Sequence, residues 1–147
     1  APLPIKIEQY DDKVVFHYEF FNSTRTVYMD GRPHPSNLKP SRLGHSIGWY
    51  DGDTLVIDTV GIEPHLVKYP AAVPDGILAS SHARGIERYT RSKDGNSLNL
   101  EMTLIDPWTL KQPLVLERPF LYGPHETLQH DDCQVNPAYL KAESAPK

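Results

Sequence analysis

Hydrophobic residues recur at every second position along residues 13–20. In an extended chain every second side chain points the same way. One side would therefore carry Val14, Phe16, Tyr18 and Phe20. The residues between them are mostly polar, and a helix would scatter both sets around its axis. A period of two is typical of a half-buried β-strand, so residues 13–20 are predicted to form one.

The same kind of run recurs along the chain, rich in β-branched and aromatic residues and separated by turn signals such as Asp51-Gly52-Asp53. The predicted strands are 5–10, 13–20, 24–29, 46–50, 54–62, 82–91, 97–105 and 113–122. Prolines and few apolar residues mark 33–43 and 64–75, which are expected to be long loops.

These eight strands predict an all-β protein. Consecutive antiparallel strands favour a single up-and-down barrel or a strongly curved sheet, lipocalin-like in outline, with a two-sheet sandwich as the main alternative. Residues 1–122 would form this β-barrel domain. Residues 123–147 are expected to be an irregular C-terminal tail packing on or extending from it, with a short helix only near 137–143.

Charge and cysteine content reduce the number of function classes that fit the chain. The 147 residues include 15 Lys and Arg and 19 Asp and Glu, a net charge of −4, which gives no basic face for nucleic acid. No apolar run is long enough to span a bilayer. Cys133 is the single cysteine, so no disulfide within the chain is possible. A free thiol and a bond through Cys133 to a partner chain or a second copy both remain open.

Gly44-His45-Ser46-Ile47-Gly48 matches G-x-S-x-G, the nucleophile elbow of α/β-hydrolases. That motif works where a buried strand ends in a sharp turn and a helix follows. Here a loop precedes the motif and a strand follows it, so a hydrolase function is not favoured. The glycines are instead expected to allow a bend or bulge where a strand begins.

Five residues are candidates for acid–base catalysis. Histidine titrates near neutral pH, and a nearby carboxylate can orient it or shift its pKa. The candidates are His45, His82, Tyr50, Asp58 and Glu87. Both histidines stand at predicted strand entrances, so they are expected at the same rim of the barrel. A purely structural hydrogen bond to a loop carbonyl is the alternative for each.

Aromatic residues within the strands can either line an interior or fill it. The candidates for contact with a flat organic ligand or a sugar ring are Phe16, Tyr18, Tyr28, Trp49 and Tyr89. The same residues would serve as ordinary core. Charged strand residues are mostly expected to face solvent in cross-strand ion pairs, whereas an Arg–Glu pair inside the barrel would be a sign of function.

The chain contains seven histidines, but no two have the H-x-H or helical H-x-x-x-H spacing of a metal site. The densest group of potential ligands lies within residues 125–133, where a solvated acidic tail explains it equally well. No metal and no cofactor are therefore expected.

Residues 27–35 (VYMDGRPHP), 44–58 (GHSIGWYDGDTLVID) and 87–89 (ERY) resemble an uncharacterised family of secreted bacterial β-rich proteins. Its pattern is YLDGRPHP…GHSIGxWEGDTLVV…ERF, and the likeness covers about residues 4–122. The resemblance implies export to the periplasm or beyond. Family members carry a further N-terminal stretch with a cysteine, so this chain is expected to be a processed or shorter relative.

Three functions remain open from the sequence. The first is binding of a small organic ligand, aromatic or sugar-like, inside the barrel. The second is a lyase, isomerase or hydratase reaction using a histidine and a carboxylate in the same pocket. The third is an accessory subunit of a larger assembly. The fold alone does not choose among them.

Overall fold

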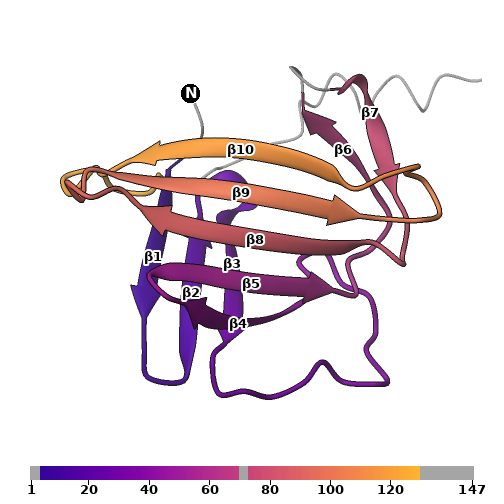
Figure 1. The fold of residues 1–147 in the computed structure, drawn as a ribbon, viewed down its shortest axis with the longest axis horizontal. Coiled ribbons are helices and arrows are strands. Elements are labelled where there is room, and N and C mark those ends of the chain that lie inside the picture. Colours follow the sequence, from indigo (N-terminus) through magenta and orange to yellow (C-terminus); the bar gives the residue numbers. More distant parts are fainter. Residues whose placement is uncertain (1–3, 70–72, 130–147) are drawn as a thin grey trace, which may run out of the picture.

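The computed structural model describes residues 4–69 and 73–129, and these residues form an all-β structure (Figure 1). Eight strands make one sheet in the order β1-β2-β3-β4-β5-β8-β9-β10. Their bounds are Ile5–Gln9, Lys13–Tyr18, Ser23–Tyr28, His45–Asp51, Thr54–Val60, Arg84–Arg91, Ser97–Ile105 and Leu114–Leu121. A short 3-10 turn, η1 (Phe20–Asn22), joins β2 to β3. Within the described part of the chain, no helix is long and apolar enough to cross a membrane.

Each of the eight strands expected from the sequence is present in this sheet. One pairing differs from an up-and-down order: β3 and β4 are parallel, with Val27 opposite Ser46. Parallel neighbours need a long connection, and residues 29–44 supply it.

Residues 64–75 were expected to form a loop, and that prediction was wrong in part. Two further strands, β6 (His65–Tyr69) and β7 (Val73–Ala79), form a separate antiparallel hairpin. A two-stranded hairpin has only edge strands, where prolines such as Pro74 are tolerated.

The eight-stranded sheet is strongly curled, and β1–β3 cross behind β8–β10 (Figure 1). β1 and β10 stand at the two ends of the strand order, so the sheet is an open half-barrel. The expectation of a strongly curved sheet is therefore confirmed. We call the side facing into the curl the inner face and the opposite side the outer face.

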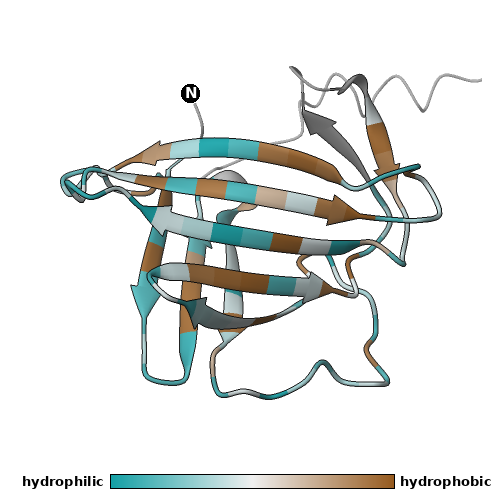
Figure 2. Cartoon of the chain, viewed as in Figure 1, coloured by the Kyte–Doolittle hydropathy of each residue, from teal (hydrophilic) through white to brown (hydrophobic). Residues whose placement is uncertain are grey.

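The inner face is filled by side chains. Phe16, Val27 and Ile57 are fully buried there, and Tyr89 packs against them with its ring 5.4 Å from that of Phe16. Partly buried residues from both ends of the strand order close this core: Ile5, Ile7, Tyr18, Leu98, Leu100 and Phe120. The alternation that predicts a strand is visible as alternating colours along β9 (Figure 2).

β5 departs from simple alternation because both of its faces are buried. Ile57 belongs to the inner core, whereas Val56 and Asp58 are covered on the outer face. The 29–44 loop passes over this end of the sheet. It is held there by a bridge between Ser41 and Ile62. A buried aspartate on the outer face is therefore a consequence of the loop.

Candidate functional site

The candidate site is built around Asp58, a nearly fully buried carboxylate on the outer face of β5. A buried carboxylate is costly unless it is paired. Arg84 supplies the pairing through two bonds, Nε to Oδ1 at 2.9 Å and Nη2 to Oδ2 at 2.6 Å. β5 and β8 place Asp58 opposite Ile86, so Arg84 extends from the same face two residues away. The fork geometry fixes the orientation of the carboxylate.

Two histidines lie in sequence outward from the Asp58 carboxylate. His34, in the 29–44 loop, places its buried Nε2 3.5 Å from Oδ2 of Asp58, an ion-pair distance without hydrogen-bond geometry. Its other nitrogen, Nδ1, lies 2.7 Å from Nδ1 of His45, the first residue of β4. Three side chains from a loop and two strands are therefore joined by successive contacts, and we call them the Asp58–His34–His45 array.

Aromatic and cationic side chains flank His45. The Tyr28 ring stacks on the His45 ring with centroids 5.3 Å apart, and the Arg32 guanidinium lies 4.1 Å from the Tyr28 centroid. Burial, followed by the proximity of His34 and Arg32, lowers the pKa of His45 below its usual value. His45 is therefore held neutral near pH 7, the form in which an imidazole can accept a proton.

The short contact between the two imidazoles constrains their protons. Two Nδ1 atoms 2.7 Å apart require that one carries a hydrogen and the other accepts it. If His45 donates, His34 carries its own hydrogen on Nε2, facing the Asp58 carboxylate. Nε2 of His45 is then the nitrogen left to accept a proton from outside the array. Positive charge on the pair would be stabilised by Asp58.

A second polar cluster occupies the inner face. Arg25 on β3 forms two hydrogen bonds to Glu87 on β8, at 2.7 and 3.2 Å, and Tyr89 donates to the same carboxylate at 3.1 Å. The side chains of Arg25 and Glu87 are only 11% and 9% exposed. Burial raises the pKa of Tyr18 to about 12 against the opposing effect of Arg25, and burial followed by the nearby Glu87 charge also raises the pKa of Tyr89. An interior Arg–Glu pair, which was expected to be a sign of function, is therefore present, but it is enclosed by the core.

The remaining predicted catalytic residues lie apart from the array. His82 is exposed and stacks on Trp108, with ring centroids 4.7 Å apart. It does share an end of the sheet with His45, because β4 and β8 both begin there. Tyr50 is exposed and donates a hydrogen bond to Gln9.

The predicted ligand-binding aromatic residues divide between the two faces. Phe16 and Tyr89 are buried in the inner core, where Tyr18 packs against them. Tyr28 contacts His45 on the outer face, and Trp49 is about half exposed. The structure therefore does not gather the five residues around one space.

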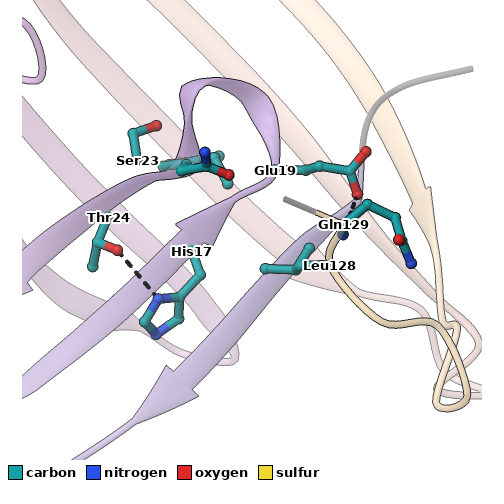
Figure 3. Close-up of a pocket in the computed structure, with 8 residues that line it drawn as sticks. His17, Glu19, Ser23, Thr24, Leu128 and Gln129 are labelled. Carbon is teal, nitrogen blue, oxygen red and sulfur yellow. Dashed lines mark hydrogen bonds between the residues drawn. The ribbon is translucent and has the colours of Figure 1, made fainter. Parts of the chain in front are cut away.

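Among the hollows on the described part of the chain are two that are open to solvent. The first, about 280 Å³, lies between the β2–η1–β3 hairpin and residues 128–129 (Figure 3). Tyr18, His17 and Thr24 are among its lining residues, and Thr24 and His17 are 3.3 Å apart at Oγ1 and Nδ1. The second, about 490 Å³, crosses β8–β10. Neither includes a residue of the Asp58–His34–His45 array.

The G-x-S-x-G segment has structural roles. Ser46 is buried and shares a 2.8 Å hydrogen bond with Thr59. Gly44 has a φ of +65°, which provides the bend before β4. A Cβ on Gly48 would lie 2.8 Å from both Met29 and Val27, so a glycine is required for close packing.

Sequence reasoning found His45 and Asp58 but missed His34 and Arg84. Pro33 and Pro35 flank His34 and restrict the loop that carries it, which was the available signal. Arg84 carried no signal beyond its charge, because its role depends on the pairing of β5 with β8.

Cys133 and residues 130–132 of the ligand-rich 125–133 segment lie outside the described residues, which end at 129. Over the ranges 4–69 and 73–129, no group of three His, Cys, Asp or Glu residues could hold a metal ion. Comparison of the chain with protein-family models, curated proteins and solved structures finds no match. The case for function therefore rests on the geometry.

Proposed function

We propose that this chain is an acid–base enzyme domain of the lyase, isomerase or hydratase type, in which His45 exchanges a proton with a small organic substrate. The observation that carries the proposal is the 2.7 Å contact between His34 and His45, with Asp58 behind it. Such an array lets one imidazole gain a proton while the positive charge moves inward to the second imidazole, which faces a carboxylate.

The proposed step begins at a C–H bond next to a carbonyl group of the substrate. Nε2 of His45 takes the proton, and the electron pair of the C–H bond moves to the carbonyl oxygen as an enolate. The hydrogen on Nδ1 of His45 passes to Nδ1 of His34, whose positive charge then faces Asp58. Return of the proton to another atom gives isomerisation, and loss of a β-hydroxyl group as water gives dehydration.

The filled inner face supports this proposal over ligand carriage inside the curl. Phe16 and Ile57 occupy that space, and Arg25 is already satisfied electrostatically by Glu87. The outer-face array instead combines a lowered histidine pKa with a partly exposed ring. Perturbed titratable groups that are accessible to solvent are the usual components of catalytic sites.

The test is hydrogen exchange at carbon in D₂O, followed by NMR, with small hydroxy ketones, ketoses and 3-hydroxy acids. We expect deuterium to enter the position next to the carbonyl in at least one of them. Loss of a general base lowers such rates by about 10²–10⁴-fold, which is the expected effect of His45→Gln. His34→Gln should show a smaller loss.

The matched control is His65→Gln, since His65 is an exposed histidine that bonds only locally, to the Glu63 carbonyl. This variant should keep the full exchange rate. Absence of exchange with every compound, or undiminished exchange in His45→Gln, would contradict the proposal.

A further inference from the structure

Trp108 and His82 form a stacked pair on the surface, away from the Asp58–His34–His45 array. Their rings are nearly parallel, with a 12° interplanar angle and centroids 4.7 Å apart. Trp108 is nevertheless 73% exposed. One face of the indole therefore rests on His82, and most of the remaining ring surface meets solvent.

The turn that carries Trp108 is held rigidly. Asp106, only 1% exposed, accepts hydrogen bonds from the backbone N–H of Ser80 at 2.7 Å and from its hydroxyl at 2.8 Å. It also accepts one from the N–H of Trp108 at 3.2 Å. The Ser80 hydroxyl in turn accepts from the N–H of His82 at 3.1 Å. One buried carboxylate thus fixes both residues of the stack.

A small hydrophobic cluster supports the same region from beneath. Ala79, Ala83 and Leu104 are buried together, and Leu110 packs against them. The segments bearing His82 and Trp108 are therefore anchored on both sides of the stack. A surface ring that is already immobilised loses little conformational entropy when a ligand binds, which raises its affinity.

We propose that Trp108 and His82 form a platform that stacks against one sugar ring of a polysaccharide. The C–H face of a pyranose is apolar and flat enough to cover the indole face opposite His82, while the His82 ring holds the indole in place from the other side. This binding role is independent of the proposed acid–base reaction.

The openness of the platform favours a chain over a single small molecule. A polymer can rest one ring on an open platform while its neighbouring units extend past it.

The experiment uses the full chain with Trp49→Phe, so that all indole fluorescence comes from Trp108. The probes are cellohexaose, chitohexaose, laminarihexaose and maltohexaose, together with retention on the matching insoluble polysaccharides. We expect one of the four to change the emission and to retain the protein. Trp108→Ala should weaken retention by about tenfold or more, and His82→Ala by about threefold.

Trp49→Phe itself should be retained like the parent chain, and circular dichroism should show Trp108→Ala to be folded because the indole is largely exposed. Absence of any response to all four sugars would overturn the proposal. So would equal retention of Trp108→Ala and the parent. An emission change with the weakly fluorescent compound benzoate but with no sugar would assign the platform to aromatic compounds instead and overturn the proposal.

Discussion

The two faces of the curled sheet each carry an Arg–carboxylate pair, but they use it in different surroundings. On the inner face, Arg25 and Glu87 are both almost fully buried, and the Arg25 guanidinium lies against the rings of Phe16 and Tyr18. On the outer face, Asp58 is 6% exposed while its partner Arg84 is 52% exposed. The inner pair is locked within the core, whereas the outer pair touches both the core and solvent.

This difference separates structural from chemical use of the same residue types. Breaking a buried ion pair leaves an uncompensated charge away from water, so it should affect stability most. A half-exposed pair can reorganise with solvent, and Asp58 also faces His34. Loss of a partner on the outer face should therefore cost less stability than the same loss on the inner face.

The largest expected effect is that of Arg25→Met. It leaves the buried Glu87 carboxylate without its cationic partner and should lower the free energy of unfolding by about 3–5 kcal/mol. Urea denaturation measures it. The double variant Arg25→Met with Glu87→Leu should recover part of the loss, because neither charge then remains. A single variant as stable as the parent chain would show that the inner pair is not buried in solution.

Asp58→Asn should have an intermediate effect. It weakens the bonds from Arg84 to a buried oxygen pair, at a cost of about 1.5–3 kcal/mol. It should also slow the exchange reaction catalysed through His45, because His34 loses the opposing charge. If the variant kept both the stability and the exchange rate of the parent chain, Asp58 would have neither the structural nor the catalytic role. Urea midpoints and NMR exchange rates give the two readouts.

The contribution of His45 should depend on pH. Its pKa in the folded state lies below the ordinary value of 6.5, for the reasons of burial and neighbouring charge given above. Below about pH 6.5 the unfolded chain therefore binds the proton more readily than the folded chain. The stability contributed by neutral His45 is complete above that pH and is lost as the pH falls towards the folded-state pKa.

We therefore expect His45→Gln to lose less stability than the parent chain between pH 7.5 and 5.5, as measured by urea midpoints at each pH. His65→Gln serves as the control and should follow the parent. A parent chain that gains stability relative to His45→Gln on acidification would reverse the assigned direction of the shift.

The smallest effect is expected at Arg88, which pairs with Asp51 at 2.7 Å on the outer face with both side chains well exposed. Solvent-exposed pairs of this kind contribute about 0–1 kcal/mol. Arg88→Met should therefore be close to neutral in urea denaturation. A cost as large as that of Arg25→Met would mean that the contrast between the two faces does not follow burial.

The sequence by itself determined the eight strands of the large sheet, though not β6 and β7, and which residues of β2 face the core. Alternation along residues 13–20 placed Val14 and Phe16 in the core, because a pleated backbone sends alternate side chains to opposite sides. Turn residues such as Gly52 fixed where strands end, since local backbone preferences act over a few residues.

Only the tertiary structure decided which residues meet. The contact of His34 with His45 depends on how the 29–44 loop returns over the sheet, and that of Arg25 with Glu87 joins strands 62 residues apart in sequence. The parallel pairing of β3 with β4 is equally non-local. Periodicity reports the environment of one strand at a time, whereas these contacts arise from the curl of the whole sheet.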